Sequence, residues 1–184
     1  MNEAGCDEAG RGCLAGPVVA AAVILPEGFC HSLLVDSKRL TESQRNEARG
    51  VVLSNALAWG IGVVNAAEID VINILNASIL AMHRALDRLK VKPRHVAVDG
   101  NRFKPWQFVP FTTVVKGDAR LANIAAASIL AKTERDAIME RFHSVLPVYG
   151  FDAHKGYPTA RHYEAIAWYG ASPWHRLTFK GVKQ

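Results

Sequence analysis

The chemically unusual feature of the chain is a pair of adjacent acids, Asp7 and Glu8, within the apolar, glycine-rich stretch 5–16. Two like charges are costly to hold in such a setting unless a cation lies between them. Oxygen-only ligands of this kind suit magnesium or manganese rather than zinc. The pair therefore predicts a site for a hard divalent cation, with an ordinary surface turn that carries a stray acid pair as the alternative.

The residues that follow predict how both acids reach one site. Neighbouring side chains of a regular strand point to opposite faces, so the strand must end or bulge near Asp7 and Glu8. Gly10 and Gly12 supply the backbone freedom for such a break. Arg11 lies between them and offers a fork of donors beside backbone amides that can approach a phosphate closely. We therefore expect Gly10, Arg11 and Gly12 to bind substrate.

Two further acids follow predicted strands. Asp99 ends the apolar segment 95–99, and Asp118 follows the segment 111–116. Sites of α/β proteins usually lie where strands end. Taken alone, Asp99 is typical of a tight turn and Asp118 of a helix N-cap, so only their company makes them candidates.

Several different short motifs are spread along nearly the whole chain, and the order in which they occur is informative. They are Asp7-Glu8-Ala9-Gly10-Arg11-Gly12 with the segment 14–25, Asp36-Ser37-Lys38, Val98-Asp99-Gly100, Lys116-Gly117-Asp118, the alanine-rich segment 125–132 and Lys155-Gly156-Tyr157-Pro158-Thr159. This series resembles bacterial ribonuclease HII, a family of endonucleases that cut RNA embedded in or paired with DNA. Several motifs in the right order are more specific than any one of them.

The resemblance implies that Asp7, Glu8, Asp99 and Asp118 are the catalytic and metal-binding residues. Two Mg²⁺ or Mn²⁺ ions about 3.5–4 Å apart would offset the four carboxylates while clamping an in-line phosphoryl displacement. The resemblance also implies that one ion activates water and the other stabilises the leaving 3′ oxygen. The expected substrates are RNA–DNA hybrids and duplex DNA cut on the 5′ side of single ribonucleotides, with 5′-phosphate and 3′-hydroxyl products.

Recognition of RNA needs groups other than the acids. Only the 2′-hydroxyl marks a single ribonucleotide, and the backbone of the 10–12 turn lies beside the acids in sequence. The resemblance implies that Tyr157 and this turn sense the RNA-to-DNA junction, with a buried core tyrosine as the alternative. Lys38 is a candidate phosphate contact, although exposed lysines more often only solubilise a protein.

Other polar residues are weaker candidates. Ser128 and Lys132 lie one helical turn apart and either face the substrate groove or are ordinary boundary residues. Lys155 is a lesser candidate for a phosphate contact. His154 and His175 lack the sequence neighbours expected of a metal or triad histidine.

Length and composition indicate one globular domain. The 184 residues are 49% hydrophobic and 21% charged, and the net charge of +5 favours a polyanionic partner without proving one. The three cysteines include no CxxC pair, which favours reduced thiols inside a cell. No signal peptide or membrane-length apolar run is apparent, so a cytoplasmic monomer that binds no membrane is the default expectation.

The hydrophobic pattern predicts a mixed sheet of about five strands with helices on both faces. Predicted strands cover residues 3–7, 17–25, 58–65, 95–99 and 111–116, and predicted helices start near residues 42, 65, 121 and 159. The pairs Thr41 with Gln44 and Asn65 with Glu68 have the form of capping boxes. The resemblance implies the ribonuclease H-like α/β fold specifically.

The C-terminal third is predicted in less detail. The resemblance implies one catalytic domain over 1–184, in which a helical segment from about 148 to 184 binds substrate. The predicted helix after Leu121 packs its alanines on the sheet and carries residues 134–141 into solvent, whereas Tyr163, Ile166 and Ala167 of the last helix face inward. Nothing in the sequence fixes the basic tail from residue 175 onward.

Four other assignments are compatible with parts of this pattern. Gly10, Gly12 and Ala15 formally satisfy a dinucleotide-binding fingerprint, but that motif must open a helix and here Pro17 and a strand follow. A non-catalytic hybrid-binding module of the same fold would gain nothing from repelling carboxylates beside a phosphate groove. A related two-metal nuclease on another nucleic acid stays open. Ribonuclease HIII is disfavoured by the Gly-Arg-Gly turn and by the lack of room for that family's extra N-terminal domain.

Overall fold

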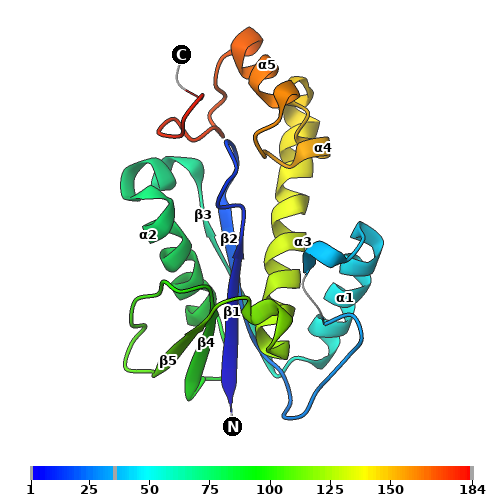
Figure 1. The fold of residues 1–184 in the computed structure, drawn as a ribbon, viewed down its shortest axis with the longest axis vertical. Coiled ribbons are helices and arrows are strands. Elements are labelled where there is room, and N and C mark those ends of the chain that lie inside the picture. The colour runs from blue at the N-terminus through cyan, green and yellow to red at the C-terminus, as the bar shows by residue number, and fades with distance from the viewer. Residues whose placement is uncertain (1, 35–36, 183–184) are drawn as a thin grey trace.

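The computed structural model describes residues 2–34 and 37–182, except for the side chain of Lys38. A five-stranded mixed sheet forms its centre, with strands in the order β3-β2-β1-β4-β5 (Figure 1). The strands are β1 (Glu3–Ala9), β2 (Val18–Ile24), β3 (Ala58–Val64), β4 (His95–Asp99) and β5 (Phe111–Val114). The predicted mixed sheet and its five strands are confirmed.

Strand pairing brings the acids at the strand ends together. β1 pairs antiparallel with β2 and parallel with β4, with Cys6 opposite Val98. β4 in turn pairs parallel with β5, with Asp99 opposite Val114. Because the carboxyl ends of parallel strands meet at one edge, Asp7 and Asp99 each follow a paired residue at the same end of the sheet.

The helices are α1 (Glu42–Asn55), α2 (Ala66–Asp87), α3 (Ala122–Val145), α4 (Phe151–His154) and α5 (Ala160–Tyr169). Short 3₁₀ turns lie at Ser37–Arg39, Gly117–Ala119 and Pro147–Tyr149. Both predicted capping boxes, at Thr41 and Asn65, are present. These local signals worked because a cap depends only on residues within one turn of the helix start.

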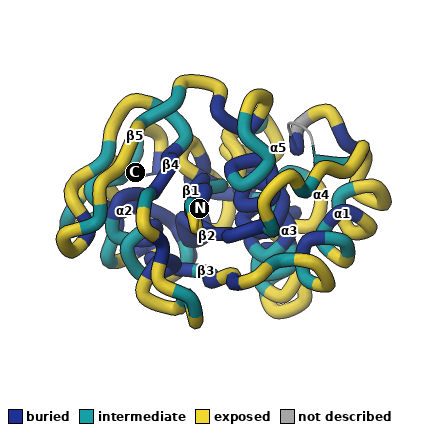
Figure 2. Tube along the Cα trace, turned by 90° about the horizontal axis from the view of Figure 1, so that it is seen from below, coloured by how far each residue is buried: buried dark blue, intermediate teal, exposed yellow. Residues whose placement is uncertain are grey.

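The two faces of the sheet carry different layers. α2 packs on one face, and α3 with α1 packs on the other (Figure 1). Viewed from below, the buried parts of β1, β2 and α3 lie in the middle of the molecule (Figure 2). A Cβ added at Gly5 of β1 would lie 2.2 Å from the Asn123 backbone carbon, so α3 rests almost directly on the central strand. This close approach requires a residue without a side chain at position 5.

α2 differs from the expectation in two respects. Asn73 has a left-handed φ of 64°, which kinks the helix in its first half. In the part of the chain that the structure describes, α2 is also the one helix long and apolar enough to cross a membrane by length and composition, contrary to the expectation of no such run. Ile69, Met82 and Leu86 of this helix are buried against the sheet, as in a core helix.

The C-terminal third corrects several predictions. Arg135 and Asp136 are buried rather than solvated, because the segments 10–17 and 146–157 fold back over the second half of α3. On α5, Tyr163 is 41% exposed and Ala167 is exposed as well. The buried side of α5 is formed by His162, Ala165 and Ile166.

Candidate active site

A cavity of about 270 Å³ opens at the edge of the sheet where β1 and β4 end. It is lined by Asp7, Glu8, Ala9, Gly10, Arg11, Gly12, Ser37, Asp99, Ser128, Lys132 and Tyr157. A larger hollow of about 680 Å³ follows edge strand β3, but its one acid, Glu134, already pairs with Arg49 at 3.0 Å. The smaller cavity is therefore the one that combines acidic side chains, basic side chains and glycine backbone.

Most of the predicted site residues meet in this cavity. Three of the four predicted acids line it, together with the whole 10–12 turn and Tyr157. Asp118 is not among the lining residues, and the side chain of Lys38 lies outside the described residues. Ser128 and Lys132 also line the cavity.

Backbone donors fix two of the carboxylates. Asp7 Oδ1 accepts the Glu8 N–H at 2.7 Å, and Asp99 Oδ1 accepts the Gly117 N–H at 2.7 Å. Glu8 lies 3.1 Å from the Arg11 guanidinium, which is half exposed at the cavity mouth. The Asp7 carboxylate is thus oriented by the backbone of β1, which stays paired with β2 as far as Ala9, and the Asp99 carboxylate by the turn after β5.

Burial makes Asp7 and Glu8 hard to ionise. It raises the pKa of Asp7 well above its usual value, and the neighbouring charges of Glu8 and Asp99 raise it further. A hydrogen bond from the Ser128 hydroxyl opposes part of that rise. Burial also raises the pKa of Glu8, while Arg11 acts in the opposite direction. The cavity therefore concentrates negative charge that a bound cation would stabilise.

Asp118 sits beside the cavity rather than on its wall. It is buried in the turn Gly117–Ala119, directly after the residue whose N–H holds Asp99. Lys116 opens this turn with a left-handed φ of 55°. The short turn after β5 replaces the helix N-cap that Asp118 alone would indicate.

The donor set fits a hard divalent cation. Among the described residues, no three histidine, cysteine, aspartate or glutamate side chains already enclose a metal position. Asp7, Glu8 and Asp99 nevertheless present only carboxylate oxygens to one cavity, without the nitrogen and sulfur ligands typical of zinc. The chemistry of these donors matches magnesium or manganese.

Tyr157 forms the opposite wall of the cavity. It is 41% exposed, so it is not the buried core tyrosine of the alternative prediction. Its hydroxyl hydrogen-bonds with the Cys13 thiol, and the Lys132 ammonium and Arg135 guanidinium lie 5.9 and 5.8 Å from its ring centre. One end of the side chain is anchored, and part of it stays accessible.

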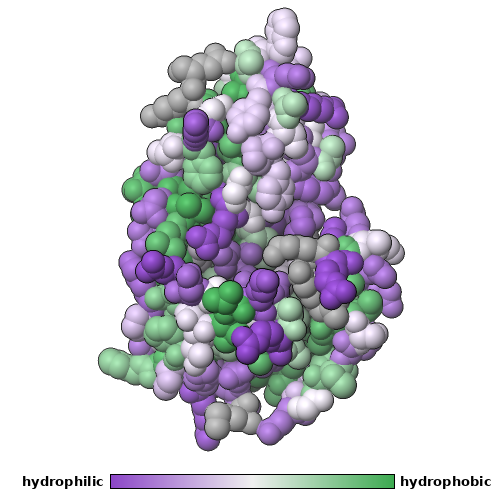
Figure 3. All heavy atoms as spheres, in the orientation of Figure 1, coloured by the Kyte–Doolittle hydropathy of each residue, from purple (hydrophilic) through white to green (hydrophobic). Residues whose placement is uncertain are grey.

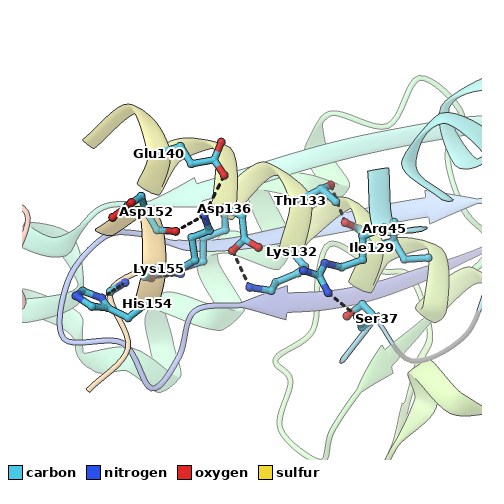
Figure 4. A network of polar contacts seen from close by, with 12 residues as sticks. Ser37, Arg45, Ile129, Lys132, Thr133, Asp136, Glu140, Asp152, His154 and Lys155 are labelled. Atoms are coloured by element: carbon cyan, nitrogen blue, oxygen red, sulfur yellow. Dashed lines mark hydrogen bonds and ion pairs between the residues drawn. The ribbon is translucent and has the colours of Figure 1, made fainter. Parts of the chain in front are cut away.

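Lys155 turns away from this wall. Its ammonium group contacts Glu140 at 2.9 Å and the Asp152 carbonyl at 2.6 Å, and Figure 4 shows both contacts. Lys132 pairs in the same view with Asp136 at 2.7 Å. Lys132 is thus the lysine of this network that reaches the cavity, while Lys155 braces α4 against α3.

Three histidines pack against the loop that carries Tyr157. His162 Nδ1 lies 2.9 Å from the Tyr157 carbonyl, and His162 Nε2 lies 3.0 Å from His175 Nε2. His154 accepts the Gly156 N–H and its ring stacks on His162. Burial lowers the pKa of His162 and of His175 to about 4, so both rings are neutral near pH 7. They hold the loop by hydrogen bonds rather than by charge.

Sequence reasoning missed two buried arginines and a thiol. Arg135 and Arg176 are fully buried behind the 10–17 turn, and Cys13 contacts Tyr157. No local signal marks them, because Arg135 lies between acids on a helix and Arg176 lies in the basic tail. Only the return of the C-terminal segment over the turn makes them part of the site.

Comparison with known proteins points to one family. The family model described as ribonuclease HII matches residues 4–182. A ribonuclease HII from Phocaeicola vulgatus is 61% identical over 97% of this chain and 89% of its own length. Among solved structures, ribonuclease H2 from Pyrococcus horikoshii is 27% identical with a TM-score of 0.82, covering 99% of this chain and 95% of its own. A more distant structure, Bst-RNase HIII in complex with Mn²⁺, is 16% identical with a TM-score of 0.78, covers 100% of this chain and 68% of its own, and shows the fold alone.

Proposed function

The chain belongs to the ribonuclease HII family and is a ribonuclease H acting on RNA–DNA hybrids, and we propose that it also nicks duplex DNA on the 5′ side of single ribonucleotides. We further propose that the reaction requires Mg²⁺ or Mn²⁺ and leaves 5′-phosphate and 3′-hydroxyl ends. The observation that carries this proposal is the cavity in which Asp7, Glu8 and Asp99 face the 10–12 turn and Tyr157.

In this proposal Asp7, Glu8 and Asp99 hold the divalent ions, with Asp118 as the fourth ligand from the adjoining turn. Such ions, when bound, lower the pKa of water and offset the charge of the phosphate under attack. The Mn²⁺ complex of Bst-RNase HIII, which shares the fold, supports the choice of ion. The crowding of buried carboxylates argues against a non-catalytic binding module, which would gain nothing from it.

The other cavity residues prepare the site for a phosphate backbone. Ser128 bonds to Asp7, and its hydroxyl lies 2.9 Å from that of Ser37, so the two serines fix the direction of this carboxylate. Arg11 and Lys132 place positive groups at the cavity, where they attract phosphates on either side of the bond to be cut. These contacts position the strand without reading its sequence.

Discrimination of RNA falls to the turn and the tyrosine. The N–H groups of Arg11 and Gly12 have no acceptor among the described residues and lie next to the acids. They are suitable donors to a 2′-hydroxyl oxygen, and the ring of Tyr157 offers a face for the following deoxyribose. In this proposal the segment from about 148 onward belongs to the same catalytic domain and contributes Tyr157 to substrate binding.

A duplex with one ribonucleotide tests the proposed function. The wild type, incubated with Mg²⁺, Mn²⁺ or chelator, is expected to cut 5′ of the ribonucleotide only when a metal is present. Asp7→Asn should lose nearly all turnover, whereas Glu47→Gln, a matched acid-to-amide change on the exposed side of α1, should not. Cleavage by metal-free enzyme, or cleavage elsewhere in the duplex, would refute the proposal.

A further inference from the structure

Arg135 and Arg176 are the two largest fully buried side chains of the described part of the protein, each with 0% exposure. No carboxylate among the described residues forms an ion pair with either guanidinium. Burying a charged side chain without an opposite charge is expensive, and burial lowers the pKa of Arg176 to about 10. Two such residues beside one cavity call for a role beyond filling space.

Backbone carbonyls take the place of the missing carboxylates. Arg176 Nη2 donates to the Gly10 carbonyl at 2.7 Å and Nη1 donates to the Arg11 carbonyl at 2.9 Å. Its Nε and Nη2 also donate to Gly16, at 3.0 and 2.9 Å. One guanidinium therefore gathers both ends of the turn that leads from β1 to β2.

These bonds set the direction of the turn's N–H groups. In a trans peptide the carbonyl of one residue and the N–H of the next point in opposite directions, and no peptide bond of the described segments 2–34 and 37–182 is cis. When the carbonyls of Gly10 and Arg11 point inward to Arg176, the N–H groups of Arg11 and Gly12 must point outward. Both residues line the cavity, so these N–H groups point toward the cavity.

Arg135 joins this turn to the loop that carries Tyr157. Its Nη2 donates to Ala15 at 3.0 Å, and its Nη1 donates to Lys155 at 2.7 Å. The same guanidinium lies 5.8 Å from the ring centre of Tyr157. Gly10 makes this approach possible, because a Cβ there would lie 2.0 Å from Arg135 Nε.

We propose that Arg176 and Arg135 are positioning residues for ribonucleotide recognition: Arg176 aims the N–H groups of Arg11 and Gly12 into the cavity, and Arg135 fixes the distance between that turn and Tyr157. The inference rests on the proposed function, because it assigns the geometry of the 2′-hydroxyl reader to two buried guanidiniums. Neither arginine touches substrate, so both act through the backbone they hold.

The test compares affinity for two duplexes of the same sequence, one with a single ribonucleotide and one all DNA. Asp7→Asn serves as the background so that neither duplex is cut, and Arg176→Lys is added to it. Lysine keeps the charge but cannot reach several carbonyls with a fixed fork. The preference for the ribonucleotide duplex should fall roughly tenfold, the equivalent of one hydrogen bond, while affinity for the all-DNA duplex stays unchanged.

The matched control is Arg84→Lys, which loses a similar arginine bond to the Val63 carbonyl at 2.7 Å, far from the cavity on α2. This control should keep the full preference. Equal weakening of both duplexes by Arg176→Lys, or an unchanged preference, would overturn the inference. If the Asp7→Asn protein without the arginine substitution shows no preference for the ribonucleotide duplex, this result refutes the proposed function itself and not only the role of the two arginines.

Two measurements protect the test against a variant that does not fold. Arg135→Lys is measured in the same way and should also lower the preference. In the wild type, the amide hydrogens of Arg11 and Gly12 should exchange rapidly with solvent and become protected by the ribonucleotide duplex but not by the all-DNA duplex. Amides already protected in the free protein would show that the turn does not face outward and would overturn the inference.

Discussion

At the scale of single residues, Asp7 combines burial with two neighbouring acids. A carboxyl whose pKa is raised in the folded protein destabilises the fold as the pH rises through that pKa, because the unfolded chain ionises more readily. At pH 7 and without metal, the buried Asp7 carboxyl therefore makes folding less favourable than an unperturbed carboxyl would. A bound cation would reverse the sign of this contribution.

Asp7→Asn should accordingly raise the melting temperature of the metal-free protein. About 1 kcal/mol of relief corresponds to roughly 2–4 °C for a chain of this size. Mn²⁺ should raise the melting temperature of the wild type more than that of the variant. Calorimetry with and without Mn²⁺ checks both effects, and a lower melting temperature of the metal-free variant would contradict the crowding of the acids.

Substitutions of Tyr157 test recognition of the ribonucleotide separately from the cleavage chemistry. Tyr157→Ala removes the ring that lines the cavity. This variant should cut single-ribonucleotide duplexes at least roughly tenfold more slowly than the wild type does. Its loss of activity on continuous hybrids should be smaller, and its metal binding should be unchanged. Tyr157→Phe keeps the ring and loses only the bond to Cys13, so it should retain most activity. The measurement is the cleavage rate of each variant on the two substrates. If Tyr157→Ala lost the same fraction of its rate on both, Tyr157 would have no role in sensing the RNA-to-DNA junction.

The residues of the cavity were predictable to different degrees. Asp7, Glu8, Asp99, the 10–12 turn and Tyr157 lie in short motifs, and their types alone indicate metal and phosphate chemistry. Arg135 and Arg176 were not predictable, because an arginine is normally solvated and its burial depends on contacts with carbonyls more than a hundred residues away. For the inward side of α5, the prediction was right for Ile166 and wrong for Tyr163 and Ala167, since long-range packing decided which face was covered.

At the scale of elements, the turn between β1 and β2 allows a paired comparison of two glycines. Gly10 has a left-handed φ of 96°, and a Cβ there would collide with Arg135. Gly12 has open space around its Cβ position. The two glycines of one motif therefore have different physical reasons to be there.

Gly10→Ala should lower the free energy of unfolding by more than about 1 kcal/mol, because both its backbone conformation and the space for a side chain are unsuitable. Gly12→Ala should leave stability nearly unchanged and affect only substrate approach. Denaturant unfolding of the two variants provides the measurement. Similar stabilities would show that Gly10 does not make the close contact with Arg135.

The histidines under the Tyr157 loop predict how that element responds to acid. His162 has a pKa of about 4 in the folded protein and an ordinary value near 6.5 when unfolded, so the unfolded chain binds more protons between these pH values. Stability is therefore lost as the pH falls from about 6.5 toward 4, by about 3 kcal/mol for one such histidine. Above about pH 6.5 the histidine is neutral in both the folded and the unfolded state, so it adds no pH dependence to the stability.

His162→Gln should remove that part of the pH dependence. The wild type should be clearly more stable than the variant at pH 7, and the gap should narrow toward about pH 4.5 as the buried histidine becomes protonated. Urea unfolding at several pH values measures the gap, and titrations common to both proteins cancel in the difference. A gap that stayed constant with pH would contradict the depressed pKa.

The elements themselves were largely predictable. All five strands and the capping boxes at Thr41 and Asn65 follow from local patterns that the structure confirms. The kink at Asn73 and the 3₁₀ turn that carries Asp118 were not foreseen: Asn73 caps the following helical turn by accepting the Asn76 N–H at 3.1 Å, and the turn at Asp118 is held by the bond from Gly117 to distant Asp99. Strand ends and turns are where local preference and tertiary contacts compete most.

At the scale of the whole molecule, the sheet and the C-terminal segment divide the work. The sheet edge supplies the acids, and the segment that returns over β1 supplies Tyr157, Arg176 and a bond from Leu14 N–H to the Gly156 carbonyl. Hydrophilic side chains cover much of the face shown in Figure 3, and the net charge is +5. Under the proposed function, the net positive charge attracts a nucleic-acid backbone generally, and the cavity sets the position of the cut.

The most direct test of this account is the structure of Asp7→Asn bound to a DNA duplex that contains one ribonucleotide. The account predicts the phosphate on the 5′ side of the ribonucleotide in the cavity beside Glu8 and Asp99. It also predicts the 2′-hydroxyl within hydrogen-bond distance of the Arg11 or Gly12 N–H, and the next deoxyribose against Tyr157. A ribonucleotide bound elsewhere, such as along the β3 edge, or a 2′-hydroxyl turned away from the turn, would contradict it.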